Sequence, residues 1–207
     1  MKINLYFAST ALFLLIVSCS PRSVHIEEAI QKNTNPLRFE LTHKRITGNL
    51  SAIAENENLE VLILNFNALN SLPREFGRLK NLKKLHLYGN NLKELPPEIG
   101  ELKSLQELIL GRNPITEVPS SLRNLQELKI LALDDTRITL SEKDVEILAS
   151  LTGLRILDLS DIPTITETPS NIELLKHIPR ILLKNTKLTL KEREKIFLAL
   201  PNTQLVK

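Results

Sequence analysis

The sequence predicts an α/β solenoid, a short horseshoe with a parallel β-sheet on its concave face and helices or 3₁₀ turns on its convex face. The first observation is a repeat whose starts fall 23 residues apart, at Leu59, Leu82, Leu105 and Leu128. The second is that apolar and variable residues alternate at the start of each unit, which is typical of a strand with one buried side. The third is composition, since 42% of the residues are hydrophobic but only 4% are aromatic. An aliphatic core formed by stacking repeats satisfies all three observations.

The N-terminal residues predict an export signal. Lys2 is the only charged residue in the range 1–18, and residues 5–17 form an apolar stretch that is too short to span a bilayer. Cys19, the only cysteine of the chain, directly follows Ile16, Val17 and Ser18. This run resembles the lipobox of bacterial lipoprotein signals.

The lipobox resemblance implies that residues 1–18 are a cleaved lipoprotein signal peptide and that Cys19 is acylated. It also implies an exported protein anchored by its lipid to the bacterial cell membrane or outer membrane, with exposure at the cell surface left open. An ordinary signal peptide followed by an incidental cysteine is the alternative. Because no second cysteine exists, the mature protein holds together without a disulfide.

Residues 19–35 are interpreted as the lipidated cysteine, a tether and a short N-terminal cap helix. Ser23 is a candidate N-cap, and Glu27 and Glu28 suit the first turns of a helix because acidic groups favour its N-terminal dipole. We expect this helix to cover the first repeat.

Residues 36–207 carry the repeats. The segment LKKLHLYGNNLKELPPEIGELKS at 82–104 resembles the leucine-rich repeat family, whose pattern is LxxLxLxxNxLxxLPxxIxxLxx, and the resemblance extends from about Pro36 to Val206. An edge strand near Leu205 is left open. The other strands are predicted to begin near Phe39, Leu62, Leu85, Leu108, Leu131, Leu157 and Ile181.

Polar residues follow the strands at a fixed position of the repeat. Asn67, Asn90 and Asn113 are expected to face inward and to satisfy backbone groups that would otherwise lack partners. Thr136 and Thr186 occupy the same position in later repeats, where their hydroxyl groups can do part of this work. These residues are therefore interpreted as structural.

Two later repeats contain longer return segments, which begin at Thr139 and Thr189. Each opens with a T-x-x-E sequence, the pattern of a capping box. We expect true helices there, whereas the shorter returns of the earlier repeats predict 3₁₀ or helical turns.

No motif for catalysis is found. The chain has no P-loop, GxSxG, HExxH or glycine-rich dinucleotide loop, so we expect neither an enzyme nor a cofactor, a metal or a small-molecule substrate. Its 27 Lys and Arg against 24 Asp and Glu give a net charge of +3, spread along the chain, which argues against nucleic acid. Function is therefore expected in binding.

The candidate partner-binding residues are the outward-facing positions of the concave strands. An apolar group there is expected to mark an interaction site, although strand propensity alone could also explain it. The apolar residues are Ile63, Phe66, Tyr88, Ile109 and Ile130. The flanking residues are Lys84, His86, Arg112, Asp134 and Asp158. His86 is taken as a surface contact residue and not as a metal ligand, because no carboxylate or histidine stands at a metal-like spacing from it.

Acidic side chains gather on neighbouring strands of this face. Asp135 and Asp161 share a repeat position in adjacent strands, which places them about 5 Å apart, and Asp134 and Asp158 lie beside them. A solvated salt ladder with Arg112 on one side and Arg180 and Lys184 on the other is preferred over a calcium site.

The sequence thus predicts a lipid-anchored cell-envelope protein that recognises a protein partner through its concave face. The alternative is a structural envelope protein that associates with cell-wall polymer or with itself.

Overall fold

The leucines that alternate with variable residues in each repeat point into one continuous core. In the computed structural model, which describes residues 23–206, the side chains of Leu85, Leu87, Leu108 and Leu110 are fully buried. The buried cluster extends from Ile26 to Leu200. Each repeat therefore covers the leucines of the next, as the sequence predicts.

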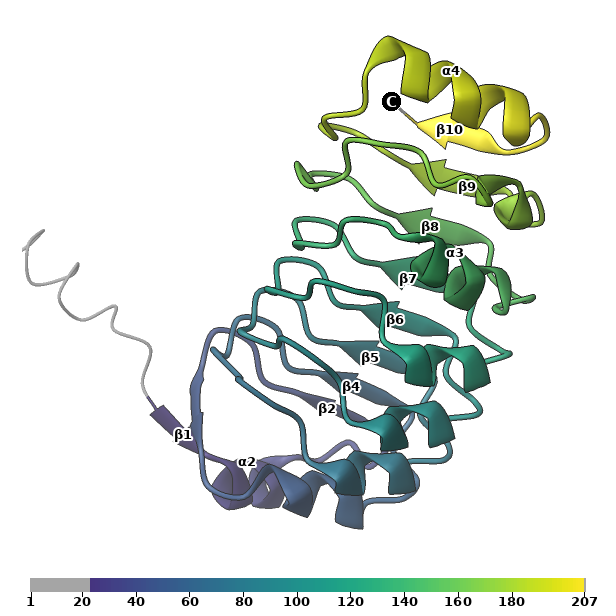
Figure 1. Ribbon diagram of the computed structural model, residues 1–207. Helices are drawn as coiled ribbons and strands as arrows, with labels where there is room; N and C mark the ends of the chain where they lie inside the picture. Colours follow the sequence, from purple (N-terminus) through teal and green to yellow (C-terminus); the bar gives the residue numbers. More distant parts are fainter. Residues whose placement is uncertain (1–22, 207) are drawn as a thin grey trace, which may run out of the picture.

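The main sheet contains eight parallel strands in the order β2-β4-β5-β6-β7-β8-β9-β10, which Figure 1 shows stacked in chain order. Each begins one residue before its predicted position, and the edge strand near Leu205 is present. The strands are β2 (Arg38–Glu40), β4 (Val61–Ile63), β5 (Lys84–His86), β6 (Glu107–Ile109), β7 (Ile130–Ala132), β8 (Ile156–Asp158), β9 (Arg180–Leu182) and β10 (Gln204–Val206). The predicted parallel sheet is confirmed.

Helical segments form a second row along the solenoid (Figure 1). Most repeats use short 3₁₀ helices, and two use α-helices, as predicted. The 3₁₀ helices are η1 (Leu50–Glu55), η2 (Arg74–Arg78), η3 (Pro97–Glu101), η4 (Ser120–Asn124) and η5 (Ile172–Leu175). The α-helices are α3 (Glu142–Ala149) and α4 (Leu190–Ala199).

The capping of α3 differs from the prediction. Ser141, not Thr139, is its N-cap, and Ser141 and Asp144 form both bonds of a capping box. Serine and aspartate at this spacing satisfy two free N–H groups of the first turn. At α4, Thr189 accepts a hydrogen bond from the Glu192 backbone N–H as predicted, but the Glu192 carboxylate bonds to the Thr168 N–H.

The N-terminal end is covered by α2 (Ile26–Lys32) and by β1 (Ser23–His25), which pairs with β3 (Arg45–Thr47). Ser23 lies in β1, so its prediction as the N-cap is wrong; His25 holds that position without a side-chain cap bond. Ser23 pairs with Arg45 in the strand ladder, two residues before the N-cap. Ile26 is fully buried, and α2 covers the first repeat as expected.

The asparagines behind the strands are buried and bonded to backbone groups. Asn90 accepts hydrogen bonds from the N–H groups of Asn67 and Leu69, both at 3.0 Å, and donates to the carbonyls of Leu64 and Leu87 at 2.9 and 2.8 Å. Asn113 repeats this pattern one repeat later. Thr136 and Thr186 each donate to a carbonyl three residues back. Their structural role is confirmed.

The predicted signal peptide, 1–18, and Cys19 lie outside the described residues. Within residues 23–206 no helix is long and apolar enough to cross a membrane.

Candidate functional site

A column of left-handed residues runs along one edge of the sheet, just after the strands. A positive φ costs a residue with a side chain about 1–2 kcal/mol, so its repetition shows that the turn geometry is imposed by the stacked repeats. We call these residues the turn column. They are His43, Phe66, Gly89, Arg112, Asp135, Asp161 and Asn185, with φ between 52° and 68°.

Aromatic rings occupy the N-terminal half of this edge. His43 stacks on Phe66 with ring centroids 4.2 Å apart, and Tyr88 meets Phe66 edge-on at 5.3 Å. A Cβ on Gly89 would lie 2.5 Å from the Phe66 ring, so the glycine makes room for the ring. Arg112 lies 6.0 Å from its centroid, within the range of a cation–π contact.

The apolar group is smaller than the sequence predicts. Ile63 is only 8% exposed, so the expectation of an accessible side chain at this position is wrong. In the sheet register it lies between Glu40 and His86, whose longer side chains flank it. The other four members, Phe66, Tyr88, Ile109 and Ile130, are half-buried and remain accessible for contact.

His86 pairs with a carboxylate of the neighbouring strand. Its Nε2 lies 2.9 Å from Glu107 Oε1, and Lys84 Nζ lies 2.8 Å from the other oxygen. Burial raises the pKa of the Glu107 carboxyl, but the hydrogen bonds and charges of Lys84 and His86 outweigh it and lower the pKa overall. The two basic side chains are thus held in an ion cluster on the concave face.

Asp134 follows β7 and Asp158 is the last residue of β8, and both are half-buried. Burial, followed by the charge of Asp158, raises the pKa of Asp134 to about 6. Burial and then the charge of Asp134 raise the pKa of the Tyr88 hydroxyl. The concave face therefore has three regions. They are an ion cluster (Lys84, His86 and Glu107), an apolar centre (Phe66, Tyr88, Ile109 and Ile130) and, toward its C-terminal half, an acidic end (Asp134 and Asp158).

The family described as a leucine-rich repeat region matches residues 37–181. The chain belongs to the leucine-rich repeat family. This fold supports a role as a protein–protein interaction module. No curated protein matches the chain.

Three solved structures are similar to this chain, and the first two, with TM-scores above 0.5, show the same fold. The plant peptide hormone receptor RGFR1 in complex with RGF2 is 30% identical, with a TM-score of 0.58, and the match covers 72% of this chain and 26% of the receptor chain. An internalin from Listeria monocytogenes is 17% identical with a TM-score of 0.64, over 82% of this chain and 47% of its own. A leucine-rich repeat protein from Leptospira interrogans is 25% identical with a TM-score of 0.44, over 82% and 60%. The chain thus spans less than two thirds of each.

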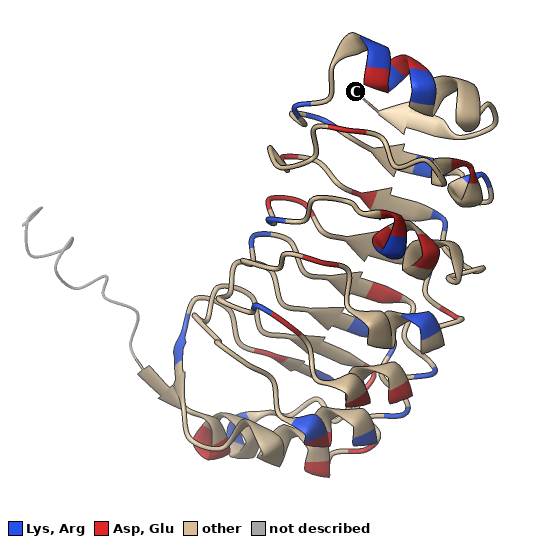
Figure 2. Cartoon of the chain, in the orientation of Figure 1, with Lys and Arg blue, Asp and Glu red and all other residues tan. Residues whose placement is uncertain are grey.

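In the described part of the chain, the predicted salt ladder is present only at Asp135, while Asp161 is hydrogen-bonded to a neutral side chain. Arg112 Nε lies 4.0 Å from Asp135 Oδ2, and Asn185 donates a hydrogen bond to Asp161 Oδ1 at 2.7 Å. Among residues 23–206 no group of three or more His, Cys, Asp or Glu is placed to hold a metal. Figure 2 shows the two signs of charge interspersed along the leucine-rich repeats.

The most exposed large apolar side chains lie on α4, which the concave-face prediction missed. Leu190 is 88% exposed, Leu198 71% and Phe197 59%. Their spacing of seven and eight residues places them on one side of a helix, so a helical reading of residues 189–200 could have found them. This surface is at the C-terminal end of the solenoid.

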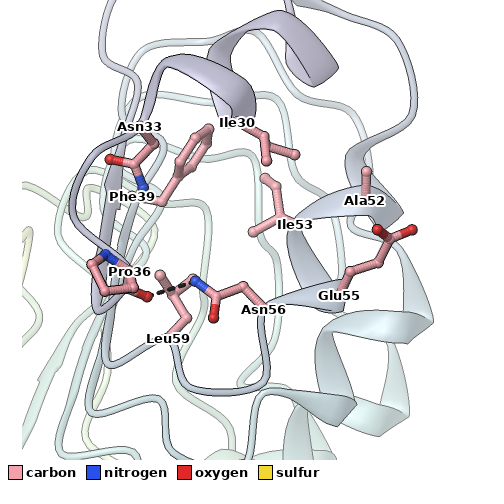
Figure 3. Close-up of a pocket in the computed structure, with 9 residues that line it drawn as sticks. All are labelled: Ile30, Asn33, Pro36, Phe39, Ala52, Ile53, Glu55, Asn56 and Leu59. Carbon is pink, nitrogen blue, oxygen red and sulfur yellow. Dashed lines mark hydrogen bonds between the residues drawn. The ribbon is translucent and has the colours of Figure 1, made fainter.

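A cavity of about 430 Å³ lies between α2 and η1, as Figure 3 shows. Its wall includes Ile30, Phe39 and Ile53, and the Asn56 amide is bonded to the Pro36 carbonyl at 2.6 Å. No histidine or cysteine lines it. The cavity thus offers apolar contact at the cap, away from the concave face.

We expect Asp134→Asn to stabilise the protein at neutral pH. The pKa of about 6 exceeds the ordinary value of 3.8, so the folded state binds the proton more tightly. The free energy of unfolding then falls as the pH rises from about 4 through about 6. At about pH 7.5 the free energy of unfolding of the variant should exceed that of the native protein by about 1 kcal/mol. This value is reduced for solvent screening, because the group is half-exposed. Urea unfolding at both pH values checks this, and an equal gain at about pH 4 would contradict the assignment.

Proposed function

We propose that this protein is an exported, lipid-anchored component of a bacterial cell envelope that recognises a protein partner through its concave face, without catalysis. The observation that carries the proposal is the accessible centre of that face, where Phe66, Tyr88, Ile109 and Ile130 are half-buried. Aromatic and aliphatic side chains flanked by charges are the usual anchors of a protein interface. The plant receptor among the structural neighbours is itself in complex with RGF2.

The proposed anchor is Cys19, four residues before Ser23 at the start of β1. An extended chain spans about 3.5 Å per residue, so the acylated cysteine would lie within about 14 Å of the cap. The cap would then face the lipid, while the repeats extend away from it. This arrangement leaves the concave face open to a partner in the envelope or outside the cell.

The test is capture of protein partners by the full chain in detergent, from envelope extracts and from candidate extracellular proteins. Ile109→Glu places a charge at the centre of the concave face, and Leu190→Glu makes the same exchange on exposed α4. The second variant is the matched control. Ile63→Glu is unsuitable because that residue is buried, and its ionisation would destabilise the fold.

The proposal predicts that Ile109→Glu lowers capture at least about tenfold, the effect of losing about 1.4 kcal/mol of contact, while Leu190→Glu has no effect. Circular dichroism verifies that both variants are folded. Retained capture by folded Ile109→Glu would count against recognition by the concave face.

The second candidate function is structural, with the protein associating with cell-wall polymer or with itself. The observation that favours self-association is the exposure of Leu190 and Leu198 on the last helix, because exposed apolar surface tends to mark contact sites. Sedimentation of the full chain tests it. A dimer or larger assembly that Leu190→Glu dissociates and Ile109→Glu does not would support this role.

A further inference from the structure

We propose that the acidic end of the concave face is a subsite for a cationic side chain, Lys or Arg, of the protein partner, held by the carboxylates of Asp134 and Asp158 beside Tyr88. The inference rests on the proposed recognition function and names the chemistry that the partner must present. Its occupant is a basic polypeptide segment.

The sheet register places the subsite residues on one side of the sheet. Ala132 pairs with Asp158, and alternation along the strands carries Asp134 and Ser160 to the same concave side. The Ser160 carbonyl accepts a hydrogen bond from the N–H of Asp135, which aligns Ser160 with Asp134. The hydroxyl and both carboxylates therefore belong to one cluster.

Gly111 provides the space at the bottom of this cluster. It occupies the position between Tyr88 and Asp134 in successive repeats, where the Tyr88-to-Gly111 and Gly111-to-Asp134 spacings are both 23 residues. A Cβ on Gly111 would collide with the Asp134 carboxylate, so that carboxylate lies over the glycine. The backbones of Tyr88 and Asp134 are two strand spacings apart, about 10 Å, and the Asp134 carboxylate extends over Gly111 toward Tyr88.

The acceptors of this cluster lack cationic partners within residues 23–206. Asp134 has no ion pair there, and Asp158 accepts only the Ser160 backbone N–H, at 2.9 Å. Ser160 is 5% exposed, and its Oγ has no hydrogen-bond partner. A buried hydroxyl normally finds a partner, so this unmet group points to a donor that arrives with a ligand.

Two neighbouring cations are engaged elsewhere, and Lys184, which holds the position of Ser160 in the next repeat, forms no ion pair with Asp134 or Asp158 among residues 23–206. Arg112 lies beside Asp135, and Arg180 donates to the Gln204 side chain at 2.8 Å. The described residues offer no set of three metal-ligating groups at this place. A Lys or Arg side chain fits better, because it supplies several N–H donors to carboxylates and gains from the aromatic face of Tyr88.

The charge environment supports a cation as well. The charged or titratable groups that act on Asp134 or border its cluster are Tyr88, Arg112, Asp135, Asp158, Asp161 and, in the next repeat, Lys184. With burial, the acidic members raise the pKa of Asp134 to about 6. A bound cation would lower this pKa again, so binding should weaken as Asp134 becomes protonated below about pH 6.

The probe is a pentapeptide, acetyl-Gly-Gly-Arg-Gly-Gly-amide, titrated into the isotope-labelled full chain in detergent. A second peptide with citrulline in place of arginine keeps the shape and removes the charge. Backbone amide shifts of Gly111 and Gly89 report binding. We expect saturable shifts at Gly111 with the arginine peptide, and at least about tenfold weaker binding of the citrulline peptide, since hydrogen bonds to charged groups are the stronger ones.

Asp134→Asn should weaken binding of the arginine peptide by about tenfold or more, whereas Asp161→Asn should leave it within about twofold. Asp161 is the matched control because its carboxylate already accepts a hydrogen bond from Asn185. Equal binding of the two peptides, equal binding by Asp134→Asn and the native chain, or no shift at Gly111 would overturn the proposal. The peptide comparison uses the native chain and so does not depend on a variant folding.

The two proposals can fail separately. If Ile109→Glu abolishes partner capture but the peptides do not distinguish charge, concave recognition stands and the cation subsite is lost. If the arginine peptide binds as expected but capture does not depend on Ile109, the subsite stands and the proposed role of the apolar centre is lost.

Discussion

Asn90→Ala should lower the free energy of unfolding by at least about 3 kcal/mol, because each buried polar group left without a partner costs about 1–3 kcal/mol. The Asn90 amide satisfies the N–H groups of Asn67 and Leu69 and the carbonyls of Leu64 and Leu87. It is 4% exposed, so water cannot readily replace it. Urea unfolding followed by circular dichroism measures the change.

The neighbouring residue provides a matched control for this prediction. Asn91 is exposed, and its backbone N–H, which bonds to the Leu69 carbonyl, is retained in Asn91→Ala. This variant should change the free energy of unfolding by less than about 0.5 kcal/mol. If the two alanine variants were equally stable, the buried asparagines would not be the structural supports of the turns.

Cys19→Ser should abolish incorporation of labelled palmitate into the protein in a bacterial host that processes lipoproteins. A serine hydroxyl keeps the size of the side chain but cannot form the thioether on which the proposed anchor depends. Several acyl chains give stable attachment where one does not, so the loss should also release the processed protein from the membrane fraction.

Ser20→Ala serves as the control for the anchor, because it alters the next position without touching the thiol. It should incorporate label as the native chain does. Label that persists in Cys19→Ser would show that the lipobox resemblance is misleading and would leave the ordinary signal peptide as the better interpretation.

The repeat period determined most of the fold in advance. Leu62 and Leu85 fix neighbouring strands, since a one-residue shift would turn the buried leucines toward water. Asn67, Asn90 and Asn113 were also predictable, because an amide behind a buried strand must satisfy backbone groups.

Features that depend on neighbouring repeats were harder to predict. Ile63 is buried by its place between Glu40 and His86, which depends on how closely long side chains pack across a concave face. The His86–Glu107 pair joins different positions in successive repeats and lies on a diagonal of the sheet. Comparing only equivalent positions overlooks such a contact.

Some local features, such as the N-cap of α3, were also not predicted from the sequence patterns. Thr139 and Ser141 are both acceptable N-caps, and only the reciprocal bond with Asp144 selects the serine. The exposed side of α4 was missed because the search for apolar contact residues was confined to the strands. Asp134 and Asp158 were selected as candidates, but the unpaired Ser160 hydroxyl is visible only in the packed structure.

Site-specific photocrosslinking in cells tests the central claim, recognition by the concave face, most directly. A benzophenone amino acid replaces Ile109 at the centre of that face, and in a separate strain it replaces Glu127, which is exposed between η4 and β7. The account predicts a discrete crosslinked protein from position 109 and none from position 127. Crosslinks from position 127 alone, or the same products from both positions, would contradict it.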